Sequence, residues 1–292
     1  AEYYGVGEDQ EFVGVGSDDV IAMSFLTFFN SQKPVLFPDI TYSFYKVWAD
    51  LYRISYETPA LDENMAIRPL DYKGENGGII FPNPNAPTGV YMPLDQVEEI
   101  VKANQDVIVI VDEAYIDFAG PSARELLSGY DNLLVVQTFS KSRSMAGVRI
   151  GFALGSPVLI KALNDVKYSY NSYTMNLPSQ LAGTQAVKDR AYFEEIRAKI
   201  MDTRERAKKR FAELGFTFPD SMTNFILVTH ERVPARAIFD ALKKERIYVR
   251  YFNAPRLDNS LRVSIGTDEE MDVLFRFLEQ YLKEWKPAGD SE

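Results

Sequence analysis

Lys141 is the residue best placed to do chemistry in this sequence. It follows the apolar run at residues 133–136, which is typical of a buried strand, and ligands of open α/β sheets bind just outside the carboxyl ends of strands. A lysine can condense with an aldehyde to form a Schiff base. Thr138, Ser140 and Arg149 could hold an anion beside it. The alternative is an ordinary solvated loop, and other segments must decide between the two interpretations.

A glycine turn near the N-terminus is a second candidate for anion binding. Residues 11–16 are expected to form a strand that runs into the sequence GVGSDD, and an apolar helix is expected over residues 20–29. Ser17 is a good N-cap, and Asp18 suits the positive end of the helix dipole. Capping alone would explain the segment. A glycine turn that opens a helix also presents free backbone N–H groups to a phosphate.

Two more expected strands end in segments with polar side chains. The β-branched run at residues 107–111 is typical of a strand covered on both faces, and it ends in the sequence DEAY, which contains Asp112 and Tyr115. An acidic residue at a strand end is often only a helix cap. A buried strand at residues 78–81 leads into a rigid loop of three prolines and a glycine, which contains Asn85.

The order of the expected elements predicts an α/β fold with two domains. Strands and helices alternate up to residue 153, which implies a mainly parallel sheet with right-handed crossovers. The other expected elements are strands at 34–37, 52–56, 223–228, 247–250 and 261–267, helices at 94–103 and 178–214, an aromatic interruption at 168–173, and a final helix to residue 285. We therefore predict a large α/β domain at residues 1–180 and a smaller α+β domain at residues 181–292.

Composition excludes several classes of function. The 292 residues include 42 acidic and 32 basic side chains, and a net charge of −10 argues against a nucleic-acid surface. The absence of cysteine excludes disulfides, thiolate catalysis and zinc–thiolate sites, and the single histidine, His230, is expected to cap or pack locally rather than bind metal. No segment reaches the length of a membrane span, and no signal-peptide pattern is present, so we expect a cytoplasmic protein with no metal site and no membrane partner.

The pattern SKSRSMAGVRIG at residues 140–151 resembles the cofactor-lysine segment of the fold-type I aminotransferases that use pyridoxal 5'-phosphate (PLP), and more narrowly that of the histidinol-phosphate aminotransferase family. The resemblance implies a fold-type I architecture with a seven-stranded sheet. It also implies that Lys141 holds PLP covalently and that Arg149, eight positions on, binds the cofactor phosphate. Thr138 and Ser140 belong to the same implied cofactor site.

Three other segments are similar to the same family. Gly16, Ser17 and Asp18 match its phosphate cup G-x-G-S-D-E, from which Val15 and Asp19 depart mildly. The DEAY segment matches without change, which implies that Asp112 pairs with the pyridinium nitrogen and Tyr115 contacts the phenolic oxygen. A carboxylate there keeps the ring protonated and electron-withdrawing. Residues 38–45 match the family motif P-x-x-x-Y-x-x-Y, whose first tyrosine, here Tyr42, would stack on the cofactor ring. Together these segments imply the following cofactor-binding residues: Gly16, Ser17, Asp18, Tyr42, Asp112 and Tyr115.

One motif departs from the family pattern. In N-P-x-N-P-T-G the asparagine before P-T-G binds the phenolic oxygen, but this chain has Ala86 there and Asn85 one residue earlier. Asn85 is therefore a candidate cofactor contact, and the sequence does not decide whether its side chain reaches the phenolic oxygen. On the substrate side, Arg262 in the sequence RVSIGT is implied to bind an anionic group, and Arg250 and Tyr170 are further candidates.

The implied reaction transfers an amino group between histidinol phosphate and 2-oxoglutarate, with Lys141 as the base that moves the proton. The catalytic residues would be Lys141, Asp112 and Tyr115, and the enzyme would be a homodimer in which two subunits build each site. In the family, residues 1–5 would lie inside a helix well after the start, so we expect a fragment without its N-terminal arm, which binds PLP but turns over poorly. The alternatives are an aromatic or other amino-acid aminotransferase of the same fold, and a catalytically weak PLP-binding fragment.

Overall fold

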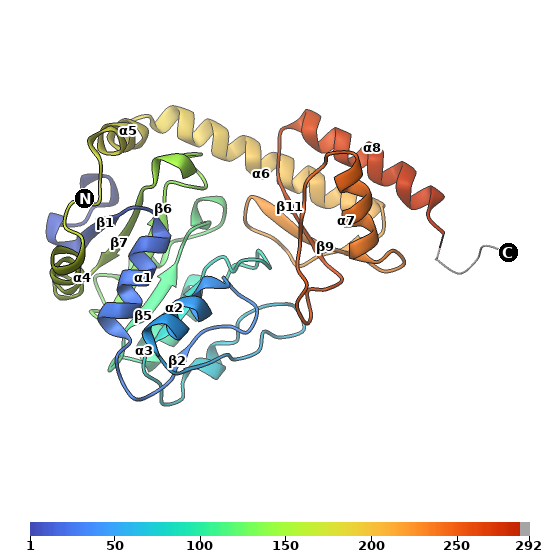
Figure 1. Cartoon of the computed structure of the whole chain (residues 1–292). Coiled ribbons are helices and arrows are strands. Elements are labelled where there is room, and N and C mark those ends of the chain that lie inside the picture. Colours follow the sequence, from blue (N-terminus) through green and yellow to red (C-terminus); the bar gives the residue numbers. More distant parts are fainter. Residues whose placement is uncertain (287–292) are drawn as a thin grey trace.

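A seven-stranded sheet forms the centre of the larger domain in the computed structural model, which describes residues 1–286 (Figure 1). The strand order is β1-β7-β6-β5-β4-β2-β3, and only β7 runs antiparallel to its neighbours. The strands are β1 (Glu11–Gly14), β2 (Val35–Leu36), β3 (Tyr56–Glu57), β4 (Ile79–Pro82), β5 (Val109–Asp112), β6 (Leu133–Thr138) and β7 (Gly151–Gly155). The mainly parallel sheet expected from the sequence is confirmed.

Both faces of this sheet are covered because successive side chains of a strand point to opposite faces. On β5, Val109 and Val111 join a core cluster with α3 (Leu94–Ala103), whereas Ile110 joins a second cluster on the other face. That second face is covered by α1 (Ser17–Phe28), α2 (Phe44–Tyr52) and α4 (Pro157–Tyr170). Burial on both sides explains why the central strands are continuous runs of valine, isoleucine and leucine.

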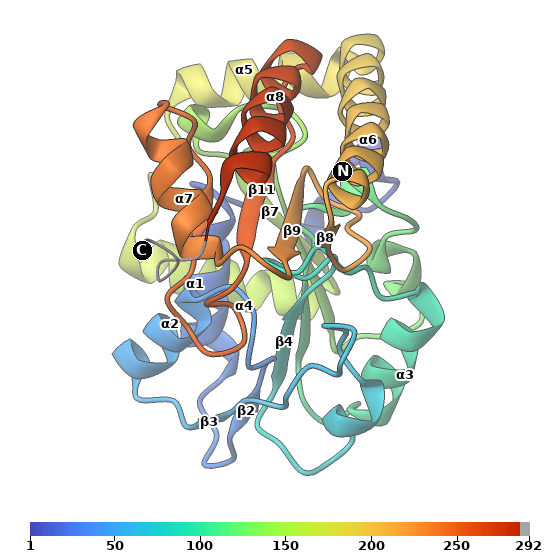
Figure 2. The same cartoon turned by 90° about the vertical axis from the view of Figure 1, so that its right-hand side faces the viewer.

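The smaller domain is built on a four-stranded antiparallel sheet with the order β10-β11-β9-β8 (Figure 2). Its strands are β8 (Phe216–Thr217), β9 (Phe225–His230), β10 (Arg250–Tyr251) and β11 (Leu261–Ser264), and its helices are α7 (Ala235–Lys244) and α8 (Asp268–Glu284). The long helix α6 (Arg190–Glu213) follows α5 (Leu177–Lys188) and reaches from the large domain into the core of the small one (Figure 1). His230 accepts the N–H groups of Arg232 and Val233 in the turn before α7, which confirms a local capping role.

Three expectations about local structure are wrong. Ser17 is the first residue of α1 and not its N-cap; Gly16 occupies that position, and the Asp19 carboxylate accepts the Val15 N–H at 3.0 Å. Tyr52 ends α2 instead of beginning a strand, because Tyr45 and Trp48 lie at helical spacing on its buried face. The helical run at 178–214 breaks at Asp189, which accepts the Tyr192 N–H and so caps α6.

Candidate active site

Lys141 and Tyr115 meet at one edge of the large sheet. They follow β6 and β5, which are parallel neighbours, so the two chain segments leave the sheet at the same edge. The Lys141 Nζ atom lies 5.2 Å from the centroid of the Tyr115 ring. Residues that the sequence separates by 26 positions are thus brought together by strand pairing.

Asp112 ends β5 and is a buried carboxylate, 5% exposed. The Tyr45 hydroxyl donates to its Oδ2 at 2.8 Å, and the Ala114 N–H donates to its Oδ1 at 3.1 Å. Burial raises the pKa of Asp112 to about 6, against the opposing effect of the Tyr45 hydrogen bond. Within residues 1–286 the carboxylate has no ion-pair partner. A cationic group of a ligand would therefore stabilise it.

Tyr45 is a site residue that sequence reasoning missed. It is fully buried, and it lies one helical turn after Tyr42, as the second tyrosine of the motif P-x-x-x-Y-x-x-Y. The sequence pattern could have indicated this residue. An amphipathic helix that begins near Tyr42 would point the Tyr45 side chain into the core, and a buried hydroxyl requires a hydrogen-bond partner.

A cup lined by backbone and by Arg149 forms where α1 begins. Gly16 has a φ of 101°, and a Cβ atom added to it would lie 2.2 Å from the Arg149 Nη2 atom. A Cβ on Gly151 would lie 2.2 Å from both the carbonyl carbon of Gly16 and the nitrogen of Ser17. These glycines therefore let β7 and the guanidinium approach the turn. The N-terminus of α1 and the guanidinium both favour an anion at this place.

The polar groups around the cup hold one another in place. The Tyr42 hydroxyl donates to Asp18 Oδ1 at 2.8 Å, and Asp18 Oδ2 lies 3.8 Å from Arg149 Nη2. The Thr138 hydroxyl accepts the Ser140 N–H at 3.1 Å and donates to the Ile150 carbonyl at 3.1 Å. The cofactor residues expected from the loops after β1, β2, β5 and β6 thus gather at one edge of the sheet.

Asn85 has a different task from the one expected. It is 1% exposed, and its amide donates to the Ile40 carbonyl at 2.9 Å and to the Thr88 hydroxyl at 3.2 Å, while its Oδ1 accepts from Thr41. Both amide hydrogens are used, so the side chain braces its loop and presents no free donor. Ala86, where the family pattern has asparagine, packs in a small cluster with Tyr115, Phe118 and Phe225.

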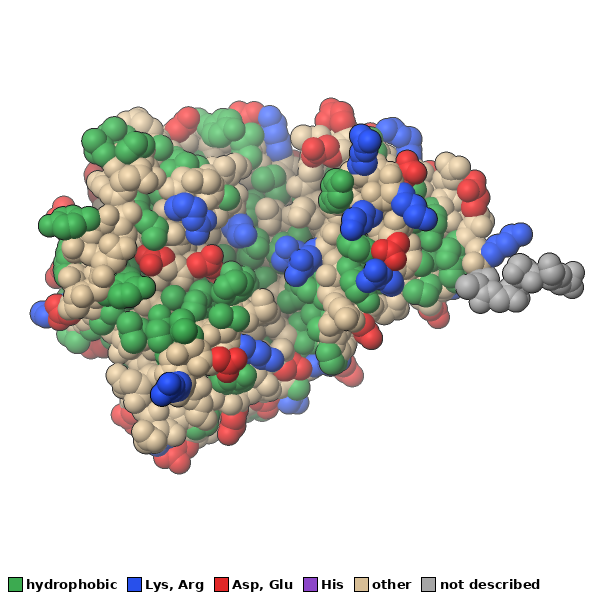
Figure 3. All heavy atoms as spheres, in the orientation of Figure 1, with side chains coloured by type: hydrophobic (Ala, Val, Ile, Leu, Met, Phe, Trp, Pro, Cys, Tyr) green, Lys and Arg blue, Asp and Glu red, His purple; other side chains and the backbone are tan. Residues whose placement is uncertain are grey.

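Aromatic rings connect the small domain to the lysine. The Arg262 Cζ atom lies 4.9 Å from the Phe225 centroid, and the Phe225 ring meets Tyr115 edge-on with centroids 5.1 Å apart. Arg262 therefore lies across the site from Lys141. As expected, its side chain lies on the face of β11 opposite Leu261 and Val263. Figure 3 shows several Lys and Arg side chains along the boundary between the two domains.

The other two expected substrate residues differ in their placement. Arg250 faces Arg262 in the antiparallel register of β10 and β11, and their Cζ atoms lie 5.5 and 5.9 Å from the Phe252 centroid. Tyr170 ends α4 and is 73% exposed, and no hydrogen bond or ring contact in the described part of the chain joins it to the lysine or the arginines. The structure brings Arg250 to the site but not Tyr170.

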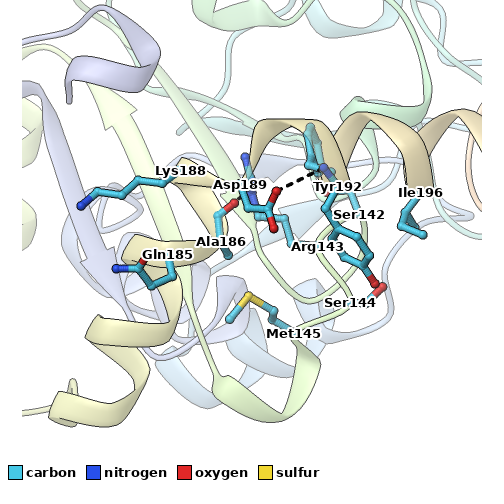
Figure 4. Close-up of a pocket in the computed structure, with 11 residues that line it drawn as sticks. Ser142, Arg143, Ser144, Met145, Gln185, Ala186, Lys188, Asp189, Tyr192 and Ile196 are labelled. Carbon is cyan, nitrogen blue, oxygen red and sulfur yellow. Dashed lines mark hydrogen bonds between the residues drawn. The ribbon is translucent and has the colours of Figure 1, made fainter.

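A pocket of about 540 Å³ lies behind the loop that follows Lys141 (Figure 4). Residues 142–145 form one wall, and the junction of α5 and α6 around Asp189 forms the other. Asp112, Tyr115, Lys141 and Arg149 do not line it. This hollow is separate from the edge of the sheet where the candidate catalytic side chains converge.

Glu113 is a second buried carboxylate that the sequence did not single out. It is 1% exposed and accepts hydrogen bonds from Ser122 Oγ at 2.5 Å, from the Ala123 N–H at 2.6 Å and from Gln137 Nε2 at 2.8 Å. Burial raises its pKa to about 7. These bonds tie the segment after β5, which carries Tyr115, to the neighbouring strand β6.

Replacing Glu113 by alanine is expected to lower the thermal unfolding midpoint by roughly 5–10 °C, because two buried donors and one half-buried hydroxyl lose their acceptor at a cost of about 3 kcal/mol. Differential scanning calorimetry measures the midpoint. Glu125→Ala removes an exposed carboxylate from the same segment and serves as the control. Equal midpoints for the two variants would contradict this account of Glu113.

Comparisons with known proteins show the family of this chain. The model of the family "Aminotransferase class I and II" matches residues 1–278. The chain is 48% identical over 283 residues to a histidinol-phosphate aminotransferase of Lactococcus lactis subsp. cremoris, covering 97% of this chain and 80% of that protein. It is 51% identical over 271 residues to one of Clostridium acetobutylicum, covering 93% and 77%.

A solved structure supports the fold. The histidinol-phosphate aminotransferase of Sinorhizobium meliloti, solved in complex with pyridoxal-5'-phosphate, superposes with a TM-score of 0.88 at 24% identity, covering 97% of this chain and 79% of that one. The chain is a class I and II aminotransferase with the fold-type I architecture. Within that class it belongs to the histidinol-phosphate aminotransferase family.

Pyridoxal 5'-phosphate is the cofactor of this enzyme class, and the residues present fit it. Asp112 is a buried carboxylate with no ion-pair partner among the described residues, which suits a protonated ring nitrogen. The cup at Gly16 and Arg149, which a Cβ atom would fill, suits a phosphate group. Lys141 lies between these two features in the order of the strands. Among residues 1–286, no helix has the length and apolar character of a membrane span.

Proposed function

We propose that this chain transfers an amino group from histidinol phosphate to 2-oxoglutarate, a step of histidine biosynthesis. The observation that supports it best is the convergence of Lys141, Asp112 and Arg149 at one edge of the sheet, with Arg262 of the small domain facing them through two aromatic rings. Relatives that are 48% and 51% identical to this chain are histidinol-phosphate aminotransferases, which supports this choice of donor.

In this proposal Lys141 attaches the cofactor and then moves a proton at the substrate carbon that carries the amine. Bound pyridoxal phosphate supplies an electrophilic aldehyde and an electron-withdrawing ring. Asp112 would hold the proton on the ring nitrogen of the cofactor, and the Tyr45 hydrogen bond orients the Asp112 carboxylate. Tyr115 would donate to the phenolic oxygen of the cofactor. These roles give Lys141, Asp112 and Tyr115 distinct tasks.

The phosphate of the cofactor would be held by backbone N–H groups at Gly16 and Ser17, by the Arg149 guanidinium and by the hydroxyls of Thr138 and Ser140. Asp18 carries a negative charge, so its side chain would orient Arg149 and Tyr42 and would not bind the phosphate itself. Tyr42 would stack on the ring. Asn85 is left out of the cofactor contacts because its amide hydrogens are used in its own loop.

On the substrate side, Arg262 and Arg250 would bind the phosphate of the donor and the carboxylate of the 2-oxo acid. A guanidinium between two rings is held in a defined plane, which suits bidentate contact with such groups. The substrate contact expected of Tyr170 stays a prediction.

We also propose a homodimer that works in the cytoplasm. Apolar side chains are exposed at helical spacing on α2 and α5, and contiguous exposed apolar surface commonly marks an interface. They are Phe44 (47% exposed), Val47 (49%), Leu51 (67%), Leu177 (64%) and Leu181 (60%). Multi-angle light scattering should give twice the chain mass, and a monomer at micromolar concentration would contradict the dimer.

A direct assay tests the function. The purified protein, saturated with pyridoxal phosphate, is given 2-oxoglutarate with histidinol phosphate, phenylalanine or tyrosine, and glutamate is measured. We expect kcat/KM for histidinol phosphate to exceed that for the aromatic amino acids by about 100-fold or more, because only this donor presents a dianion to the arginines. A preference for the aromatic donors would favour the alternative aminotransferase. If the protein binds the cofactor but turns over none of the donors, the result would favour the alternative of a catalytically weak PLP-binding fragment.

Replacing Gly151 by alanine is expected to weaken binding of pyridoxal phosphate by about 10-fold or more, because the new Cβ would lie 2.2 Å from backbone atoms of Gly16 and Ser17 and displace the cup. Gly147→Ala is the matched control, since a Cβ there meets no atom within 4 Å. The dissociation constants come from absorbance titration. Similar constants for the two variants would show that the cup does not depend on this close approach.

A further inference from the structure

Arg204 is a buried cation far along α6 that none of the roles above uses. It is 4% exposed, although arginine is seldom buried without partners. Its Nη1 atom donates to the Phe118 carbonyl at 3.0 Å and to the Thr223 carbonyl at 3.2 Å, and its Nε donates to Glu205 at 2.9 Å. One guanidinium therefore joins a loop of the large domain to a turn of the small domain.

The large-domain partner belongs to the segment that carries Tyr115. The Phe118 N–H donates to the Tyr115 carbonyl at 3.1 Å, in a single helical turn after β5. Phe118 is fully buried and packs in the same cluster as Tyr115, with Ile200 and Met201 of α6 beside them. The Arg204 hydrogen bond to the Phe118 carbonyl thus helps to hold the backbone of Tyr115, because Phe118 is itself hydrogen-bonded to Tyr115.

The small-domain partner belongs to a turn at residues 221–225 that its own hydroxyls stabilise. Ser221 and Thr223 are fully buried, and both donate to the Phe225 carbonyl. The Met222 N–H donates to the Gly89 carbonyl of the proline-rich loop at 2.8 Å. Gly89 has a φ of 81°, and a Cβ there would lie 2.4 Å from Ser221 Oγ, so the turn and the loop are in close contact. The turn ends at Phe225, whose ring separates Tyr115 from Arg262.

We propose that Arg204 is a positioning residue that sets the distance between Arg262 and Lys141 by fixing the 221–225 turn against the Tyr115 segment. The proposal rests on the proposed function for its kinetic part. Arginine suits this task because its planar group can donate to carbonyls from two directions at once, which lysine does not reproduce. Its burial makes these hydrogen bonds strong and their loss costly.

Replacement of Arg204 by methionine keeps the apolar stem and removes the donors. Arg206→Met is the matched control on the same helix, because within residues 1–286 the hydrogen bonds and ion pair of Arg206 go to Thr203 and Asp268, on α6 and α8. We expect hydrogen exchange in peptides covering 115–118 and 221–225 to accelerate by about 10-fold in Arg204→Met only. Affinity for pyridoxal phosphate should change less than about 2-fold, since the cup at Gly16 is built on other loops.

The kinetic test is a double-mutant cycle with Arg262→Gln. We expect Arg204→Met to raise the KM for histidinol phosphate by about 10-fold with a smaller change in kcat, and to add nothing to the KM of Arg262→Gln. A merely structural role would give additive effects on KM, and that result would overturn the proposal, as would unchanged exchange at 221–225. Arg204→Lys provides the same comparison if the methionine variant does not fold.

Inorganic phosphate serves as a probe that does not depend on turnover. Arg204→Met should bind it several-fold more weakly than Arg206→Met at the site that Arg262→Gln removes. If the wild-type protein fails to use histidinol phosphate, the proposed function fails, while hydrogen exchange and phosphate binding still decide the role of Arg204. Equal phosphate affinities in the two variants would overturn it.

Discussion

Replacement of Lys141 by alanine is expected to lower the single-turnover rate of amino transfer by about 10³-fold or more. The reason is that the side chain would both attach the cofactor and act as the base, and loss of a general base alone removes about 10²–10⁴-fold. Its Nζ atom lies 5.2 Å from the Tyr115 ring, at the edge of the sheet where the site residues gather. Stopped-flow absorbance with histidinol phosphate measures the rate.

The control is Lys161→Ala, which removes an exposed lysine paired with Asp165 on α4. In the wild-type protein, borohydride reduction followed by peptide mapping should place the pyridoxyl group on Lys141. Modification of a different lysine, or near-wild-type turnover by Lys141→Ala, would refute the assignment of this residue.

Asp112→Asn is expected to have opposite effects on activity and on stability. Turnover should fall on the order of 10²-fold or more, because an amide cannot hold a proton on the ring nitrogen by charge. The cofactor-free protein should become more stable above pH 6. Asparagine fits the site, since its oxygen can accept from the Ala114 N–H and its NH₂ can donate to the Tyr45 hydroxyl.

The pH dependence of the stability effect follows from the raised pKa. The Asp112 carboxyl has an ordinary pKa of 3.8 and a folded-state pKa of about 6, so between these values the folded state binds more protons than the unfolded state. Its contribution to the free energy of unfolding therefore falls as pH rises from 3.8 to 6 and stays low above pH 6. The difference between these two pKa values corresponds to a loss of at most about 3 kcal/mol in the free energy of unfolding.

Thermal unfolding of cofactor-free wild-type protein and Asp112→Asn at pH 7.5, 6 and 5 measures this effect. The advantage of the variant should be largest at pH 7.5 and shrink towards pH 5. Asp258→Asn, at an exposed position, should show no such trend. A constant difference across these pH values would show that burial of the Asp112 charge is not its cause.

The mainly parallel sheet and the positions of most elements in the large domain could be predicted from the sequence. The helix at 94–103 is confirmed, and the continuous apolar runs at β4, β5 and β6 are indeed covered on both faces. These elements have strong local signals, because hydrophobic periodicity reports which face is buried. The α2 helix was not predicted, and a strand was expected at residues 52–56; packing of Tyr45 and Trp48 against the sheet decided for a helix that ends at Tyr52.

The sequence by itself determined which residue types stand at the strand ends: a lysine after β6, an aspartate at the end of β5, and a glycine turn before α1. Only the tertiary structure decided which of the candidates meet. Asn85 was expected at the cofactor but its amide is used in its own loop, and Tyr45 and Arg204 had no assigned role until strand pairing and the domain junction placed them against Asp112 and Phe118. The physical reason is that hydrogen-bond partners far apart in the chain depend on strand order and helix packing, which local patterns do not encode.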